Sequence, residues 1–295
     1  FNSFLNAKIL VAILLAQPIV LGSLIMAAKR LSILIDTADL SLTPFLSSFK
    51  GIALSYGLGV VFPARLSELI KPVYIRRNVS VSFGEVLSAI FLERVNDLFI
   101  ISIIVAIGTL ILLSSSNLFV VWATIILLGI LILCLFKGNY LVRLLKFIPS
   151  HRLRNLIEEI IIKISNKLRR KRTFIAIIYG FLAWILSFLN IVVVLNLMGA
   201  GDIGWSGYLA VFVSSIIGGS VPALPGGFGI YEASVVFVLS GYGYNFNEAL
   251  IIALSLHVSQ LILSVILTFY ILVKDDLGIK SFYHDLIKLK DNSVK

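Results

Sequence analysis

The stretch with the clearest chemical potential is a Pro- and Gly-rich break between two apolar runs. Residues 222–232 read Pro-Ala-Leu-Pro-Gly-Gly-Phe-Gly-Ile-Tyr-Glu. Because an unpaired backbone group is costly in hydrocarbon, such a break is tolerated at membrane depth only where protein or water covers it. Gly226, Gly227 and Gly229 permit positive φ and close backbone approach, and the N–H groups that begin a following half-helix attract anions. We expect these glycines to contact an anionic ligand; the alternative is a tight turn between packed helices.

A second group of residues, Glu93, Arg94 and Asp97, lies inside another apolar run. On a helix, Glu93 and Asp97 share a face, and Arg94 and Asp97 are three residues apart and can pair. An arginine between two carboxylates tolerates burial and can still bind a phosphate through two parallel hydrogen bonds. The alternative is a structural ion network that joins helices.

A third group follows Pro63, where another apolar run ends in Pro-Ala-Arg-Leu-Ser-Glu. Arg65 and Glu68 are three residues apart and share a helical face. We expect Arg65 to bind the same anion as Arg94, with Glu68 in support; the alternative is an ordinary helix start at the membrane surface. Glu232 would repel a phosphate unless it paired with one of these arginines, which we therefore expect. The Pro-Ala match between the two breaks points to inverted repeats.

His257 and Gln260 lie in a further apolar run, in Ser-Leu-His-Val-Ser-Gln. They could form a polar relay for protons, or His257 could be a neutral histidine bonded to a neighbour. The sequence has no HExxH pair, no Gly-x-Ser-x-Gly elbow and no Walker loop, and only three histidines. We therefore assign no catalytic residue and expect neither a metal nor a cofactor.

The composition defines the elements that must position these residues. Of 295 residues, 59% are hydrophobic and 14% are charged, and the mean hydropathy is +1.04. A soluble domain would carry about a quarter charged residues. The composition therefore predicts an all-α, polytopic helical membrane protein. The single cysteine, Cys134, excludes an internal disulfide framework.

Apolar runs of about 20 residues predict about eight membrane segments. They lie near 9–28, 45–62, 86–113, 118–136, 174–198, 208–221, 229–243 and 248–273. The seventh is short and follows the Pro-Gly break, so we expect one or two segments to be broken or re-entrant. The prediction is a single membrane domain, 1–273, with a basic tail, 274–295.

Basic residues orient the segments. Lys and Arg concentrate in 64–85, 137–172 and 274–295, whereas 114–117, 199–207 and 241–247 have none. The positive-inside rule places the basic segments and the C-terminus in the cytoplasm. Lys29 and Arg30 fall on the opposite side in this scheme. The net charge of +10 then reflects topology, and no nucleic acid is expected as a partner.

The basic segment 137–172 contains an amphipathic stretch. Apolar residues of 151–168 recur at spacings of three and four and form one helical stripe. This stripe fits a helix that lies on an anionic leaflet. It fits equally a helix docked on the protein's own cytoplasmic face.

The three charged groups resemble the blocks of one family. Pro63-Ala64-Arg65-Leu66-Ser67-Glu68 resembles Pro-Gly-Arg-x-Gly-Glu, although Ala64 and Ser67 stand where the family often has glycine. Glu93-Arg94-Val95-Asn96-Asp97 resembles Glu-Arg-x-x-Asp, and Pro225 to Glu232 resembles Pro-Gly-Gly-x-Gly-x-x-Glu. In this order they are similar to the lysylphosphatidylglycerol synthetase transmembrane, flippase-like family. His257 stands where many members have arginine.

The resemblance implies a prokaryotic inner-membrane protein that moves a phospholipid or lipid-linked intermediate between leaflets. Its partners would be membrane lipids, either anionic phospholipid or lipid-linked glycan. We expect no soluble aminoacyl transferase domain of the kind that well-known members carry, so lipid aminoacylation is not implied. Two alternatives stay open. One is a membrane enzyme acting on a lipid phosphate or polyprenyl-linked sugar, with Glu93, Asp97 or Glu232 as general base. The other is a scaffold for a partner lipid synthase or glycosyltransferase. Assembly into a homo-oligomer is also open.

Overall fold

The described chain is built from helices. The computed structural model describes residues 2–37, 41–62, 66–112, 150–221 and 224–276, with isolated positions 126, 129 and 142. Arg65, Cys134 and the predicted segment 118–136 lie outside the described residues, those isolated positions excepted, as does the tail beyond 276.

The main helices follow one another along the chain as α1 (Asn2–Leu34), α2 (Thr43–Gly59), α3 (Ile70–Asn78), α4 (Phe83–Leu112), α7 (His151–Leu168), α8 (Lys171–Leu197), α9 (Gly204–Ser220), α10 (Ile230–Gly241) and α11 (Phe246–Lys274). Short 3-10 turns are η1 (Leu66–Leu69), η3 (Gly201–Ile203) and η4 (Pro225–Gly227). Stretches long and apolar enough to cross a membrane are Ala7–Leu34, Lys171–Leu197, Gly201–Ser220 and Phe246–Lys274. The prediction of a polytopic helical membrane protein is confirmed.

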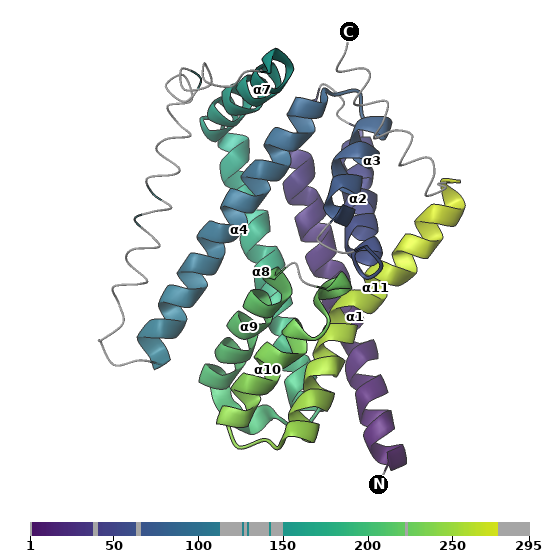
Figure 1. Ribbon diagram of the computed structural model, residues 1–295, viewed down its shortest axis with the longest axis vertical. Helices are drawn as coiled ribbons and strands as arrows, with labels where there is room; N and C mark the ends of the chain where they lie inside the picture. Colours follow the sequence, from purple (N-terminus) through teal and green to yellow (C-terminus); the bar gives the residue numbers. More distant parts are fainter. Residues whose placement is uncertain are drawn as a thin grey trace.

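Helices α9 and α10 form a hairpin whose tip is the Pro-Gly break. Both lie in the half of the molecule that carries the N-terminus, and the break joins them near the middle (Figure 1). Gly218 of α9 permits the close packing, because a Cβ there would lie 2.8 Å from the carbonyl oxygen of Ile230. The predicted runs 208–221 and 229–243 therefore form the two arms of one hairpin.

Helices α2 and α3 form a second hairpin, which starts from the opposite end (Figure 1). Segment 45–62 was predicted to cross the membrane; its helix, α2, has 17 residues, and the chain then returns beside it as α3. Gly51 lies close against the return arm, because a Cβ there would lie 3.3 Å from Cγ1 of Ile75. The tips of the two hairpins meet: a Cβ on Gly226 would lie 3.5 Å from the Cα of Val60.

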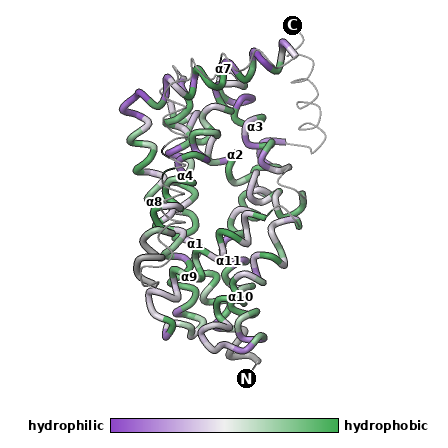
Figure 2. Tube along the Cα trace, turned by 60° about the vertical axis from the view of Figure 1, so that its left-hand side comes forward, coloured by the Kyte–Doolittle hydropathy of each residue, from purple (hydrophilic) through white to green (hydrophobic). Residues whose placement is uncertain are grey.

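In the predicted scheme Lys29 and Arg30 lay on the side opposite to the other basic segments. In the structure, α2 and α3 leave from and return to the end where α1 finishes, so Lys29 and Arg30 lie toward the same end as α3 and α7 (Figure 1). Ion pairs hold this end together: Arg170 lies 2.6 Å from Asp36, and Lys50 lies 2.9 Å from Asp275. Hydrophilic residues gather there, whereas the body of the molecule is mostly hydrophobic (Figure 2).

Helix α7 is docked on the protein itself. Its Ile164 is buried among residues of α1 and α4. Glu85 of α4 accepts hydrogen bonds from Lys167 and, at 3.1 Å, from Lys163. Leu153, nearer the start of α7, remains half exposed. Of the two interpretations of the amphipathic stretch, the docked helix is the one that the contacts favour.

Candidate functional site: a polar cavity between the hairpin tips

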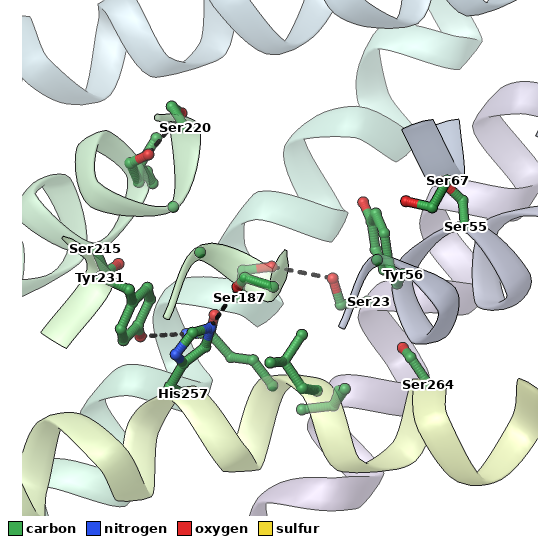
Figure 3. Close-up of a pocket in the computed structure, with 18 of the residues that line it drawn as sticks. Ser23, Ser55, Tyr56, Ser67, Ser187, Ser215, Ser220, Tyr231, His257 and Ser264 are labelled. Carbon is green, nitrogen blue, oxygen red and sulfur yellow. Dashed lines mark hydrogen bonds between the residues drawn. The ribbon is translucent and has the colours of Figure 1, made fainter. Parts of the chain in front are cut away.

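A cavity of about 400 Å³ lies where the two hairpin tips meet. Both breaks contribute to its wall, as do α1, α4, α8 and α11. The wall is rich in hydroxyl groups, which come from Ser23, Ser55, Tyr56, Ser67, Ser187, Ser215, Ser220, Tyr231 and Ser264 (Figure 3). The hydroxyl oxygen of Ser264 has no hydrogen-bond partner within the protein. Such a wall can solvate a polar group in the interior of an otherwise apolar molecule.

A buried ion network lies behind the cavity wall. The Arg30 guanidinium of α1 donates to Asp97 at 2.5 Å and to Glu93 at 2.9 Å. Lys71 of α3 donates to the second oxygen of Glu93 at 3.1 Å. All four side chains are buried. The contacts join α1, α3 and α4, so the structural interpretation of Glu93 and Asp97 is part of the answer.

Helix α8 is shaped around this network. A Cβ on Gly180 would lie 3.2 Å from a terminal nitrogen of Arg30 and 2.6 Å from the amide nitrogen of Asn96. One helical turn further on, the indole N–H of Trp184 donates to Asp97 at 2.9 Å. Glycine thus makes room for the guanidinium, and Trp184 connects the network to the cavity that it lines.

Arg94 is the cation of the network that faces the cavity. Its guanidinium lies 3.6 Å from Glu93, 3.6 Å from Asp97 and 3.9 Å from Glu68. These contacts are longer than a good charge-assisted hydrogen bond, and its side chain is 39% exposed. Its Nε has no partner within the protein. Arg94 is therefore oriented by carboxylates yet retains capacity to bind an anion.

The three glycines of the break adopt the conformation expected of them. The φ angles of Gly226, Gly227 and Gly229 are 67°, 79° and 85°. Gly226 and Gly227 line the cavity. The N–H of Gly229 instead donates to Glu232 at 2.6 Å and caps α10. The protein's own carboxylate thus occupies the place predicted for an anion at that N–H.

Glu232 pairs with a histidine rather than with Arg94. Its second oxygen lies 2.6 Å from Nδ1 of His257, and Nε2 of His257 lies 3.0 Å from the carbonyl oxygen of Gly226. The predicted pairing with Arg94 is therefore absent, and Arg65 lies outside the described residues. Gln260, one turn along α11, donates to the hydroxyl of Tyr231 at 3.0 Å. Both His257 and Gln260 line the cavity.

The sequence interpretation missed Arg30 and Lys71 as site residues. Arg30 could have been recognised because it follows an apolar run directly. In the structure it lies within the same continuous helix as that run, α1. Lys71 entered the sequence interpretation only as one of the basic residues of segment 64–85. Among the described residues, no three His, Cys, Asp or Glu side chains gather as a metal site would require.

The helices and the paired hairpins define a polytopic membrane protein with a polar cavity between its helices. Comparison with family models matches residues 3–268 to the family described as Lysylphosphatidylglycerol synthase TM region. The chain belongs to this family. Comparison with curated proteins found no match, and neither did comparison with solved structures.

Proposed function

We propose that the protein moves a phospholipid or a lipid-linked intermediate between the two leaflets of a cell membrane. The single observation that carries this proposal is the cavity at the meeting point of the two hairpin tips. A headgroup would enter it while the acyl or isoprenoid chains stayed in lipid. Membership of a lipid-related family supports this proposal.

Arg94 is the proposed headgroup ligand, with Gly226 and Gly227 as close neighbours. An anionic headgroup would complete the hydrogen bonding of its guanidinium, and the serine hydroxyls would replace water around the rest. Arg65 is proposed to assist. Glu68, Glu93 and Asp97 orient Arg94, whereas Glu232 holds the break through His257.

The same proposal includes the orientation of the molecule. The end with α3, α7 and the start of the tail would face the cytoplasm, by the positive-inside rule. The membrane domain would span 1–273, and both hairpins would be re-entrant. The enzyme alternative gains nothing from the site, because Glu93, Asp97 and Glu232 are each engaged by cations or donors.

The test is a headgroup-accessibility assay in proteoliposomes with a fluorescent anionic phospholipid and a membrane-impermeant quencher. Wild type should expose inner-leaflet headgroups faster than protein-free vesicles, and Arg94→Gln should lose most of that rate. Arg77→Gln, which changes an exposed arginine of α3 away from the cavity, is the matched control. Equal rates for wild type and Arg94→Gln would remove Arg94 from the site. A wild-type rate equal to that of empty vesicles, for both anionic phospholipid and a polyprenyl phosphate, would overturn the function.

A further inference from the structure

His257 faces a hydrogen-bond acceptor at each ring nitrogen. Nδ1 lies 2.6 Å from a carboxylate oxygen of Glu232, and Nε2 lies 3.0 Å from the carbonyl oxygen of Gly226. The other oxygen of Glu232 accepts from the N–H of Gly229. Both side chains are buried. A neutral histidine beside an ionised glutamate has one N–H and can satisfy only one of these two contacts.

The charge of this pair follows if both contacts are hydrogen bonds. Each contact then requires one hydrogen, so the pair holds two. These are either both on the imidazole, with Glu232 ionised, or one on Nε2 and one on the carboxyl group. In both arrangements the pair has no net charge, which suits its burial. Loss of one proton would leave a buried negative charge and one contact between two acceptors.

The contact that fails on deprotonation is the one to Gly226. A carboxylate is a stronger acceptor than a carbonyl, so the remaining proton stays between His257 and Glu232. Nε2 then turns a lone pair toward the Gly226 carbonyl oxygen, and the two repel. Gly226 has a φ of 67° and is the residue of the break that lies against Val60. The proton therefore acts at the contact between the hairpin tips.

The surroundings contain few other titratable groups. Tyr231 of α10 stacks on the imidazole with ring centroids 4.1 Å apart. Across the cavity lie Tyr56, Glu68 and Arg94. Among the described residues that line the cavity, α1, α8, α9 and the break contribute no ionisable side chain. Since His257 also lines the cavity, its proton has a route out through it.

We propose that the His257–Glu232 pair is a proton-binding site that holds the two hairpin tips together when occupied and releases them when empty. The proton is thus the ligand that regulates access to the cavity. The link to lipid movement rests on the proposed function, whereas the link to tip geometry does not.

Spin-label distance measurements across a pH series test the proposal. Val61 and Leu224 are exposed residues on the two tips, and Val61→Cys with Leu224→Cys in a Cys134→Ser background gives one label pair. In otherwise wild-type protein the label distance should lengthen with rising pH, with a single midpoint. Glu232→Gln should lose this shift, because the amide donates to Nδ1, accepts from Gly229 and leaves neutral His257 to donate to Gly226. His257→Arg, with permanent donors, should lose it as well.

The control is His151→Gln, which changes an exposed histidine of α7 and should retain the wild-type midpoint. A pH-independent distance in wild type between about pH 5 and pH 8, where an ordinary histidine changes its charge, would overturn the proposal. So would an unchanged midpoint in Glu232→Gln and His257→Arg. The spin-label distances can be measured whether or not the protein moves lipid. A pH-dependent tip contact without lipid movement would therefore contradict only the proposed function. Lipid movement with a pH-independent tip contact would contradict only the proposed proton site.

Discussion

The Arg30 guanidinium of α1 donates to the Asp97 carboxylate of α4 across 2.5 Å, and both side chains are buried. Glu93 accepts from the same guanidinium, so one cation holds two carboxylates that would otherwise repel. The pair fixes α1 against the helix that carries Arg94. The position of Arg94, the proposed headgroup ligand, therefore depends on Arg30, which lies 64 residues earlier in the sequence.

Removal of Arg30 should destabilise the protein strongly. Arg30→Met leaves Glu93 and Asp97 buried with less compensating charge, and breaking a buried pair in this way costs about 3–5 kcal/mol. Reversible unfolding in detergent would measure the loss. Lys29→Met is the neighbouring control: its ammonium lies 5.1 Å from the Phe45 ring, a contact worth about 0.5–1 kcal/mol. Equal stability of Arg30→Met and wild type would show that the network contributes nothing.

The hairpin formed by α2 and α3 makes a topological prediction. Ser41, before α2, and Ser80, after α3, are both exposed and should lie on the same side of the membrane; Asn247, at the start of α11, should lie on the other. Single cysteines at these positions, in a Cys134→Ser background, would be labelled in intact cells with an impermeant maleimide. Opposite sides for positions 41 and 80 would mean that α2 crosses the membrane.

Gly218 should be intolerant of a side chain. A Cβ there would meet the backbone carbonyl oxygen of Ile230 at 2.8 Å, and backbone cannot move aside without separating α9 from α10. Gly218→Ala should cost about 1–3 kcal/mol, as overpacking does. Gly241, at the other end of the same hairpin, has open space around its Cβ position, so Gly241→Ala should leave thermal stability almost unchanged. A similar loss for both variants would contradict the close packing.

Asp275 should give a contribution to stability that fades in acid. Burial raises the pKa of Asp275, but hydrogen bonds from Tyr74 at 2.5 Å and Lys50 at 2.9 Å, with the lysine charges, outweigh burial and hold that pKa below its usual value. A lowered folded-state pKa means that the contribution is present above the unfolded pKa of about 3.9 and lost as pH falls through the folded value. The unfolding free-energy difference between wild type and Asp275→Asn should therefore be constant near neutrality and shrink below about pH 4. A free-energy difference that did not change with pH would show that the contacts of Asp275 with Tyr74 and Lys50 do not stabilise the fold through its charge.

Much of the fold could be predicted from the sequence, because each membrane helix requires a long run of apolar residues. The α9–α10 hairpin was also foreseeable, since the run 229–243 is short and directly follows Pro225 and the glycines. The α2–α3 hairpin was not, because 45–62 alone is long enough for a span and the return arm, α3, is only partly apolar. Whether an apolar run turns back depends on contacts such as that of Gly51 with α3, which lie outside the run itself.

The candidate site was predictable in its local blocks but not in their partners. Glu93, Arg94 and Asp97 are within one helical turn of each other, so their proximity follows from spacing. The pairing of Glu232 with His257 spans 25 residues and depends on how α10 packs against α11. Arg30 was hidden for the same reason, since only the arrangement of α1 beside α4 and α8 makes it an interior residue.

The meeting of Val60 with Gly226 also has a mechanical consequence. Each hairpin starts from one end of the molecule, and its tip lies against the other tip and against α11. A shift of the α9–α10 tip could be taken up by the torsions of Gly226, Gly227 and Gly229, whose φ angles are positive, without movement of a long helix. The long helices α1, α8 and α11 would then form the fixed frame around the two hairpin tips.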